Sequence, residues 1–266
     1  MQDILTAGFR ELGLTPPPGA IDKLCRYSEL LLEQNKVMNL TAITQPDQVA
    51  RLHFLDSAAI LGVEQPSSEG TLIRPGQAGA PSPCEGESSK PAVQSWLSHK
   101  TVIDVGTGAG FPGVVLKILE PDLKLTLVDS LGKRVHWLEK VCEALSLDGV
   151  QCIHARAEEL ALEEGFRDSF DLAVSRAVAA YPLLCELCLP YVKPGGQFWA
   201  MKSVESAAEV AVGESAVKRL GAKALGSRDY VIPGTEVTHR LVGAEKVSPT
   251  PKGLPRSWGK IKKAPL

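Results

Sequence analysis

The sequence predicts an α/β fold with a doubly wound, mostly parallel sheet, because short apolar runs alternate with helical patterns from residue 100 onward. Five apolar runs have the length of buried strands: residues 101–105, 123–129, 150–154, 171–175 and 197–201. Strands connected through helices pair in parallel, with helices on both faces of the sheet. Ligands of such sheets bind beyond the carboxyl ends of the strands, so we expect the functional site at that edge.

Local signals indicate the helices between these strands. Pro112 suits the first position of a helix, and Ser130 is an N-cap candidate before an apolar helical face. An acidic helical segment spans residues 157–164, and two prolines bound another at residues 182–190. The turn Pro194-Gly195-Gly196 then precedes the fifth strand.

Three further helical patterns precede the first strand. The first covers residues 3–12, and the second has apolar residues at spacings of three and four over residues 21–31. The third covers residues 44–59, with Pro46 at a helix-start position. We expect residues 1–61 to form a helical extension that packs on the catalytic domain and helps to frame the substrate cleft.

A change of composition separates this extension from the strands. Residues 64–91 contain 5 prolines, 4 glycines and 5 serines among 28 positions, so they have little to bury. We expect a disordered or loosely ordered insertion or linker at residues 62–99. The catalytic domain is then expected at residues 100–248, followed by a basic tail at residues 249–266.

The overall composition excludes several classes of protein. A net charge of −2 and a pI near 6.2 mean that nucleic-acid binding requires a local basic patch. No apolar run reaches the roughly 20 residues of a membrane span and no signal-peptide pattern is present, which predicts a cytoplasmic protein. Cys185 and Cys188 lie in an apolar helical stretch without further ligands, which favours buried thiols and no metal. Without a long exposed apolar segment, we expect a monomer.

A glycine-rich turn follows the first strand. Asp104 is near the end of the strand, and Gly106, Gly108, Gly110 and Gly113 follow it. Glycines there permit a tight turn and let a ligand approach the backbone closely. Four glycines within eight residues, directly between a strand and a helix, favour a ligand site over a purely structural turn.

Two cofactors fit this turn. The spacing from Gly108 to Gly113 matches the fingerprint of dinucleotide-binding proteins. The acid-x-Gly-x-Gly-x-Gly pattern that starts at Asp104 is instead typical of methyltransferases that bind S-adenosylmethionine. Asp129, at the end of the second strand, suits ribose hydroxyls in either case. Asp104 favours S-adenosylmethionine, because a carboxylate in the turn repels a pyrophosphate and attracts the amino group of a methionine moiety.

The type of reaction is narrowed by motifs that the sequence lacks. Residues 171–178 contain no Asn/Asp-Pro-Pro-aromatic turn of the kind used to methylate exocyclic amines. The pair Pro83-Cys84 lies in the insertion, which argues against a covalent route to carbon 5 of a pyrimidine. An acceptor with a free lone pair remains, such as the N7 of guanine. It needs no general base, so we expect no catalytic acid or base, and positioning supplies most of the rate.

Several segments form a recognisable series along the chain. They are residues 35–43 (NKVMNLTAI), 53–57 (HFLDS), the turn at 104–113, 156–159 (RAEE), 175–178 (SRAV) and the C-terminal residues 255–266. In this order they resemble the bacterial 16S rRNA guanine-N7 methyltransferase family, RsmG or GidB, over nearly the whole chain. The resemblance implies a seven-stranded, Rossmann-like class I methyltransferase sheet, S-adenosylmethionine as cofactor, and 16S rRNA or the small ribosomal subunit as partner.

The resemblance also implies a cofactor site that includes Gly106, Phe111, Ala157, Glu158 and Arg176. Arg176 ends the fourth strand, where it is able to hold the methionine carboxylate or the O6 of guanine. Phe111 packs either on the cofactor or in the core, and His53 is expected to be a structural, hydrogen-bonded histidine. The complete set of expected cofactor residues is Asp104, Gly106, Gly108, Gly110, Phe111, Asp129, Ala157, Glu158 and Arg176.

The C-terminal stretch is the candidate RNA-binding surface. Residues 246–266 carry six basic residues, no acid, and Trp258, a pattern that suits phosphate and stacking contacts but also a solvated tail. The expected RNA-binding residues are Lys133, Arg134, Lys202, Arg256, Lys260, Lys262 and Lys263. Two other functions remain open: a small-molecule methyltransferase, which needs no basic tail, and an NAD-binding oxidoreductase. The long insertion is a departure from the short connection of the family, and it is not expected to touch the cofactor.

Overall fold

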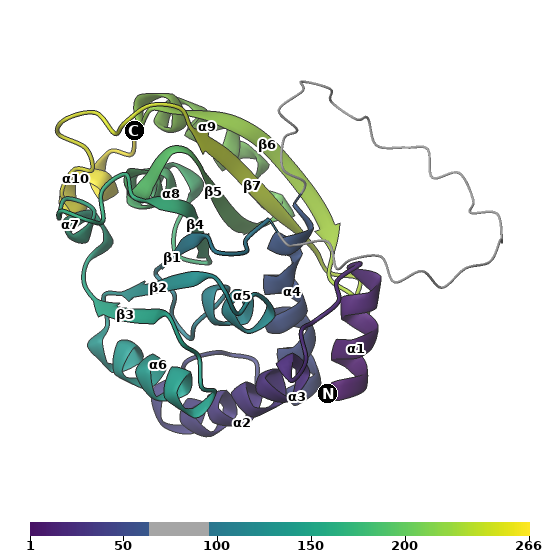
Figure 1. Ribbon diagram of the computed structural model, residues 1–266. Coiled ribbons are helices and arrows are strands. Elements are labelled where there is room, and N and C mark those ends of the chain that lie inside the picture. The colour runs from purple at the N-terminus through teal and green to yellow at the C-terminus, as the bar shows by residue number, and fades with distance from the viewer. Residues whose placement is uncertain (64–95) are drawn as a thin grey trace, which may run out of the picture.

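The computed structural model describes residues 1–63 and 96–266, which build one central seven-stranded sheet (Figure 1). The strands are β1 (Thr101–Val105), β2 (Lys124–Asp129), β3 (Val150–His154), β4 (Phe170–Arg176), β5 (Val192–Ser203), β6 (Ala222–Val231) and β7 (Thr238–Lys246). Their order is β3-β2-β1-β4-β5-β7-β6; β1 to β5 are parallel, and β7 is antiparallel to both neighbours. The predicted fold class is confirmed, and the antiparallel β7 between β5 and β6 departs from the order of dinucleotide-binding sheets.

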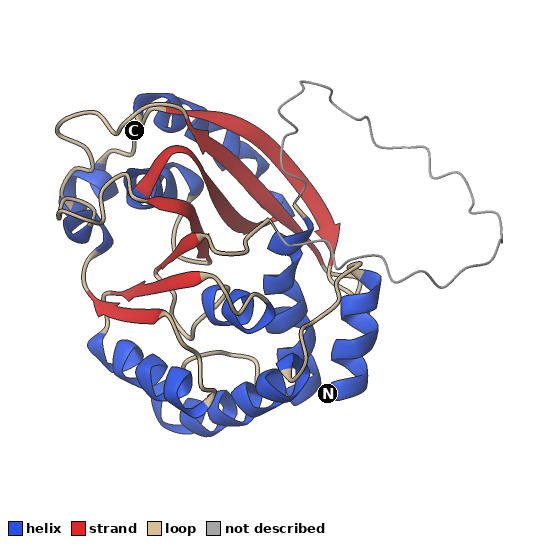
Figure 2. Cartoon of the chain, in the orientation of Figure 1, coloured by secondary structure: helices blue, strands red, loops and turns tan. Residues whose placement is uncertain are grey.

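Helices cover both faces of the sheet (Figure 2). The helices of the catalytic half are α5 (Gly113–Leu119), α6 (Gly132–Ala144), α7 (Ala157–Leu160), α8 (Tyr181–Cys188), α9 (Ala207–Arg219) and α10 (Trp258–Lys263). One apolar core joins α5, α6 and the N-terminal helices to the sheet, and a second joins α7 to α10 to its other face. Cys185 and Cys188 are fully buried in α8, as predicted for structural thiols.

The N-terminal helices pack against the glycine-rich turn. They are α1 (Gln2–Glu11), α2 (Ala20–Met38), α3 (Pro46–Val49), a π-helical turn (Ala50–Leu55), α4 (Asp56–Ala58) and a 3-10 turn (Ala59–Gly62). The sequence predicted one helix over residues 44–59, and the structure interrupts it at the π-helical turn, a deviation that is frequent at functional sites. The hydroxyl of Tyr27 on α2 donates a hydrogen bond to the carbonyl of Ala109, which joins this extension to the turn.

Some local boundaries differ from the sequence prediction. Helix α6 has Leu131 at its N-cap position and no side-chain cap, so Ser130 does not cap it. Residues 193–196 lie inside β5 and bulge opposite Asp171, where the sequence predicted a turn. Most of the predicted insertion at 62–99, including Pro83-Cys84, lies outside the described residues. Among the helices of the described ranges, none combines the length and the apolar character that a membrane span requires.

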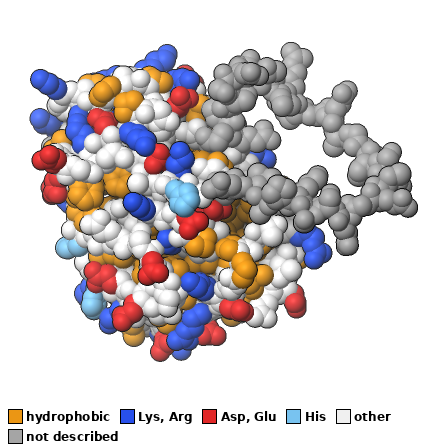
Figure 3. Space-filling view, viewed as in Figure 1, with side chains coloured by type: hydrophobic (Ala, Val, Ile, Leu, Met, Phe, Trp, Pro, Cys, Tyr) orange, Lys and Arg blue, Asp and Glu red, His pale blue; other side chains and the backbone are white. Residues whose placement is uncertain are grey.

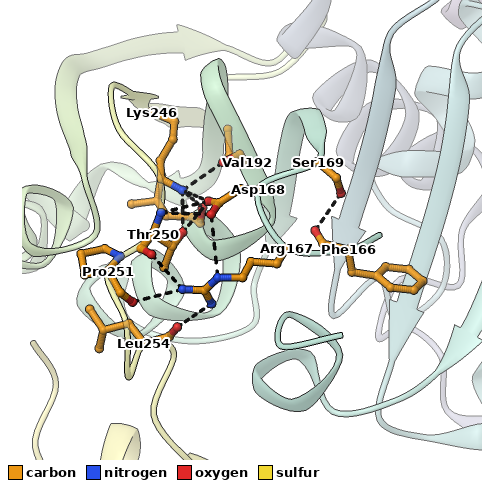
Figure 4. A network of polar contacts seen from close by, with 10 residues as sticks. Phe166, Arg167, Asp168, Ser169, Val192, Lys246, Thr250, Pro251 and Leu254 are labelled. Atoms are coloured by element: carbon orange, nitrogen blue, oxygen red, sulfur yellow. Dashed lines mark hydrogen bonds and ion pairs between the residues drawn. The ribbon is translucent and has the colours of Figure 1, made fainter. Parts of the chain in front are cut away.

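The chain after β7 folds back onto the molecule instead of leaving it (Figure 4). The ammonium group of Lys246 is fully buried and donates hydrogen bonds to Asp168, to Thr250 and to the carbonyls of Leu189 and Val192. Beside it, the guanidinium group of Arg167 donates to three backbone carbonyls, those of Thr250, Pro251 and Leu254. The interpretation of residues 246–266 as a solvated basic stretch is therefore wrong at its first residue, because Lys246 holds the segment in place.

Candidate active site

Two cavities lie at the carboxyl edge of the sheet. The first has a volume of about 260 Å³ and lies beyond the ends of β1, β2 and β3. Its wall is formed by Val105, Gly106, Val128, Asp129, Ser130, Ala155, Arg156, Ala157, Glu158, Val178, Leu187 and Trp258. Four of the predicted cofactor residues, Gly106, Asp129, Ala157 and Glu158, are thus brought together in one wall.

Gly106 is the glycine of the turn that faces this cavity. Its φ of +70° is a left-handed conformation that favours glycine. A Cβ atom added to it would lie 2.6 Å from Cγ2 of Val178, closer than atoms normally pack. The missing side chain therefore keeps open the space between the turn and Val178, as a closely bound ligand requires.

The other glycines of the turn serve packing and conformation. A Cβ atom on Gly110 would collide with the Tyr27 hydroxyl, and one on Gly113 would lie 2.8 Å from Oδ2 of Asp104. Gly108 has a φ of +59° and donates its N–H to Oδ2 of Asp129 at 2.9 Å. Since none of the three lines the cavity, the predicted cofactor roles of Gly108 and Gly110 remain predictions.

Asp104 lies beneath the turn and is fully buried. Its Oδ2 accepts hydrogen bonds from the hydroxyl of Thr107 and the N–H of Gly113, both at 2.8 Å. Its Oδ1 has no hydrogen-bond partner among the described residues. Burial raises the pKa of Asp104 to about 6, although these two hydrogen bonds oppose the shift. The carboxylate therefore organises the turn and retains an unused oxygen in a setting that favours a nearby positive charge.

Asp129 joins β2 to the turn at the cavity wall. Its side chain is 4% exposed and accepts hydrogen bonds from the N–H groups of Gly108 and Leu131, each at 2.9 Å. Arg134, predicted to bind RNA, approaches the same carboxylate at 3.4 Å. A carboxylate has about four lone-pair positions, so Asp129 retains the capacity to accept from a ligand hydroxyl.

The segment after β3 supplies the opposite part of the wall. Glu158 is 4% exposed, and its Oε1 accepts a hydrogen bond from Nε of Arg156 at 2.6 Å. The guanidinium carbon of Arg156 lies 5.2 Å from the ring centroid of Trp258, a cation–π distance. Glu158 is therefore a buried, paired acid instead of the solvated helix-start acid that its position alone suggests.

The second cavity is larger, about 750 Å³, and lies beyond the ends of β4 and β5. Its wall is formed by Leu52, His53, Asp56, Arg176, Ala177, Met201, Lys202, Ser203, Glu205, Ser206, Ala208, Glu209 and His239. Arg176, predicted as a cofactor residue, lies in this wall and not in the first. Its guanidinium group donates to Oδ2 of Asp56 at 2.9 Å and to the carbonyl of Leu52 at 3.2 Å.

Asp56 is the centre of a polar cluster in this second wall. It is fully buried, and besides Arg176 it accepts a hydrogen bond from the hydroxyl of Tyr230 at 2.6 Å and pairs with Nδ1 of His239 at 2.8 Å. Burial alone would raise the pKa of Asp56, but these hydrogen bonds and the charge of Arg176 hold it below its ordinary value. The bond to Asp56 in turn raises the pKa of His239.

His53 and Phe111 stack on one another beside Arg176. Their ring centroids are 4.5 Å apart, and the guanidinium carbon of Arg176 lies 4.9 Å from the Phe111 centroid. His53 is within 2.8 Å of the Thr41 hydroxyl and 3.1 Å of Arg176, and burial together with the charge of Arg176 lowers its pKa to about 3. Phe111 belongs to the core around Tyr27 and does not line the first cavity, so its predicted contact with a cofactor remains a prediction.

One short segment separates the two cavities. Arg176 and Ala177 line the second cavity, and Val178 lines the first. Ala177 has a φ of +56°, which is uncommon for a residue with a side chain. Unusual backbone conformations concentrate at functional sites, and here one lies at the boundary between the two cavities.

The predicted RNA-binding residues fall into two groups. Arg256 pairs with the fully buried Glu186 of α8 at 2.6 Å, and Lys202 pairs with Glu209 at 2.6 Å in the second cavity, so both already have acidic partners. Arg134 also has an acidic partner, the carboxylate of Asp129. The other four residues are exposed: Lys133, Lys260, Lys262 and Lys263. On the face drawn in Figure 3, basic and acidic side chains are interspersed instead of forming a patch of one sign.

Three residues of these walls were not found by the sequence reasoning. Asp56 was seen only as part of a family segment, Trp258 only as a possible stacking residue for RNA, and His239 not at all. Their partners lie far away along the chain, since 183 residues separate His239 from Asp56. No spacing of residues within one segment of the sequence indicates a contact over such a distance along the chain.

Comparison with known proteins identifies the family. The family model described as "GidB: rRNA small subunit methyltransferase G" matches residues 91–230. The chain is 39% identical to ribosomal RNA small subunit methyltransferase G of Alkaliphilus metalliredigens, over 99% of this chain and 98% of that protein. It is also 39% identical to the protein of the same name from Lachnoclostridium phytofermentans, over 97% and 95%. The family model and these nearly full-length similarities point to the same family, and the seven-stranded sheet with its two cavities is consistent with it. The chain therefore belongs to the GidB family, the small-subunit rRNA methyltransferases G.

Proposed function

We propose that this chain is an S-adenosylmethionine-dependent methyltransferase that methylates the N7 of a guanine in 16S rRNA. The observation that carries the proposal is the pair of cavities that adjoin across Arg176, Ala177 and Val178. Methyl transfer requires a donor and an acceptor held side by side, and their positioning supplies most of the rate when no proton has to be removed. The name of the relatives, which specifies small-subunit rRNA, supports an RNA of that kind as the substrate.

The first cavity would hold the cofactor. Gly106 leaves room for it beside the backbone, Asp129 is available to its ribose hydroxyls, and Ala157 and Glu158 would border its base. S-adenosylmethionine supplies a methyl group on a positively charged sulfur. The unpartnered oxygen of the buried Asp104 favours positive charge near the turn, which suits the methionine amino group.

The second cavity would hold the guanine. The edge of this base that carries N7 also carries O6, and both are acceptors. Arg176, Lys202 and His239 supply donors to the cavity wall, so one of them would bind O6 and hold N7 toward the first cavity. Adenine presents an amino group where guanine has O6, and these donors would disfavour it. N7 carries no proton, so His53, already hydrogen-bonded at both ring nitrogens, has no proton to remove.

The exposed lysines of α10 would contribute to RNA binding. Lys260, Lys262 and Lys263 follow Trp258, which borders the first cavity, so these lysines belong to the segment that lies beside that cavity. Lys133 lies at the start of α6, soon after Ser130 of the same wall. Such contacts to phosphates position an RNA without reading its sequence. An rRNA substrate implies a cytoplasmic enzyme, and we propose that it acts as a monomer.

Methyl transfer to defined RNAs tests the proposal. Purified protein is incubated with methyl-labelled S-adenosylmethionine and either 16S rRNA or small subunits from a bacterium that lacks its own enzyme of this family. Digestion and mass spectrometry should show 7-methylguanosine as the new labelled nucleoside. Labelled adenosine or cytidine, or transfer only to small molecules of a cell extract, would contradict it. Binding of NAD in place of S-adenosylmethionine in calorimetry would contradict the cofactor assignment.

A further inference from the structure

Among the described residues, Trp258 is the only member of the first cavity's wall that follows the last strand of the sheet along the chain. All other residues of that wall lie between positions 105 and 187, whereas Trp258 begins α10 near the C-terminus. Its indole is half-buried and borders the cavity with Ala157, Glu158 and Leu187. The segment that follows β7 thus returns to the cofactor side of the molecule and contributes a large aromatic surface there.

The indole is held in place by side chains of the same wall. Arg156 lies over its ring at 5.2 Å, and Arg156 is itself fixed by its hydrogen bond to the nearly buried Glu158. A cation–π contact backed by an ion pair restricts the rotation of both side chains. The aromatic surface is therefore organised before any ligand binds.

The backbone on either side of Trp258 is anchored too. Arg256, two residues before it, donates three hydrogen bonds to the fully buried Glu186 of α8, at 2.6 to 2.9 Å. Ile261, three residues after it, is fully buried in the second core. Farther upstream, Lys246 and Arg167 hold residues 247–254 in place through hydrogen bonds to Thr250 and Leu254 (Figure 4). Such anchoring exceeds what a solvated tail requires and fixes where the indole lies.

The sheet order indicates which part of a ligand Trp258 would meet. The first cavity runs from Gly106 and Val178 past Asp129, at the end of β2, to residues 155–158 after β3. If the ribose lies at Asp129 and the methyl group lies beside the second cavity at Val178, the base is left with the β3 end of the cavity. Trp258 contacts Arg156, two residues after the end of β3, and lies with Ala157 and Glu158 in that part of the wall. A flat base is the group that gains most from an aromatic neighbour.

We propose that Trp258 contacts the adenine of the cofactor, so that the C-terminal segment, residues 247–266, is a structural part of the cofactor site. The inference rests on the proposed function, because it takes S-adenosylmethionine as the ligand of the first cavity. It changes the role of this segment, which the sequence suggested only for RNA. Truncation or displacement of the segment is then expected to weaken cofactor binding directly.

Isothermal titration calorimetry on the full chain tests the contact. Trp258→Ala should weaken binding of S-adenosylmethionine and of S-adenosylhomocysteine by at least about tenfold, the scale of one base–aromatic contact. It should weaken 5′-methylthioadenosine by a similar factor, because that compound keeps the adenine and lacks the amino acid. Trp258→Phe should stay within about threefold of the wild type, and Lys252→Ala, an exposed change in the same C-terminal segment, should have no effect.

Tryptophan fluorescence gives a second readout that does not require a variant with weakened cofactor binding. Addition of S-adenosylhomocysteine should change the emission of the wild type, and Trp258→Phe should remove most of that change while it still binds the ligand. The remaining tryptophans, Trp96, Trp137 and Trp199, lie outside the cavity wall and serve as the internal background.

The outcomes separate this inference from the proposed function. A wild type that binds no S-adenosylmethionine would overturn both. A wild type that binds it, with equal affinity in Trp258→Ala, would overturn the inference alone. So would an affinity loss in Trp258→Ala that occurs together with an unchanged fluorescence response in Trp258→Phe, because the indole would then act only as an anchor for the helix.

Discussion

The two cavities are built in different ways. The first is formed largely by loops that directly follow β1, β2 and β3, and its shape depends on a missing side chain at Gly106. The second depends on Asp56, whose hydrogen-bonded partners Arg176, Tyr230 and His239 lie 120, 174 and 183 residues away. The first cavity is thus specified mainly by segments that directly follow three strands, with Val178, Leu187 and Trp258 as its more distant members, whereas the second exists only when the N-terminal extension and β7 meet the sheet.

The two cavities therefore place different physical requirements on the chain. The first cavity needs space beside the backbone, so a methyl group in the wrong place should damage it without unfolding the protein. The second needs balanced charge in a buried place, so the loss of one acid should affect stability as well as function. Single substitutions are able to test each requirement separately.

Asp56→Ala should have the largest effect of the substitutions considered. It removes the acceptor of three side chains and leaves the guanidinium group of Arg176 nearly buried without its acid, a change that costs about 3–5 kcal/mol. Urea denaturation measures the loss. The control is Glu29→Ala, which removes an exposed ion pair with Arg26 and should change the stability little. Equal losses in the two variants would contradict the central role of Asp56.

The pH dependence of that loss follows from the two pKa shifts. Asp56 has a lowered pKa, so its contribution is present above its ordinary value of 3.8 and is lost as the pH falls. His239 has a raised pKa, so its contribution is complete below its ordinary value of 6.5 and is lost as the pH rises through the raised value. The stability difference between wild type and Asp56→Ala should therefore be largest between these two pH values.

Gly106→Ala should act on the first cavity and spare the second. The added methyl group would lie 2.6 Å from Val178, so we expect roughly a 100-fold loss of S-adenosylmethionine affinity, equivalent to about 2.7 kcal/mol. The positive φ adds about 1 kcal/mol of backbone strain. Gly195→Ala is the matched control, because Gly195 also has a positive φ, +85°, but has open space around it. Calorimetry measures the affinity of both variants and denaturation measures their stability, which separates steric crowding from backbone strain. Equal affinities of Gly106→Ala and Gly195→Ala would show that ligand binding does not need the open space beside Gly106.

The first cavity is the part to which the sequence patterns point most directly, although only Gly106, Asp129, Ala157 and Glu158 of the nine expected cofactor residues lie in its wall. The strand at 101–105, the glycines and Asp129 are recognised from short patterns, because each depends on neighbours in the chain. The family resemblance added Ala157 and Glu158, which the structure places in the same wall. Asp104 shows the limit of this reasoning: its position was predicted, but its complete burial beneath the turn depends on packing.

The non-local cavity and the C-terminal segment were predicted poorly for a common reason. The count of charges in residues 246–266 predicted a basic tail. In the structure, Lys246 pairs with Asp168, 78 residues away in the sequence, and Arg256 pairs with Glu186, 70 residues away. His239 and Tyr230 lie on the antiparallel strands β7 and β6, which the apolar runs did not reveal. A pattern within one segment does not show which distant segment will neutralise its charge.

Asp104→Asn should give a smaller effect that depends on pH. Because burial raises the pKa of Asp104 to about 6, its ionisation increasingly opposes folding as the pH rises from 3.8 to about 6. The amide does not ionise, so the variant should gain stability relative to the wild type between pH 4 and pH 8 in urea denaturation. Its affinity for S-adenosylmethionine should fall, because the negative charge near the turn is lost. A stability difference that is independent of pH would contradict the raised pKa.

The smallest effect should come from the exposed lysines, which belong to neither cavity. Changing Lys260, Lys262 and Lys263 together to alanine should weaken RNA binding by about tenfold and reduce the slope of log affinity against log salt by about 2, near the value for three phosphate contacts with single-stranded RNA. The control with equal charge loss is the triple alanine variant of Lys124, Lys140 and Lys218, which are exposed near the opposite edge of the sheet, where β2 begins and α6 and α9 end. Filter binding over a range of salt concentrations compares the two. An equal reduction of the slope in both would mean that RNA responds to net charge alone. A reduction confined to the first would place the RNA at the edge where both cavities lie.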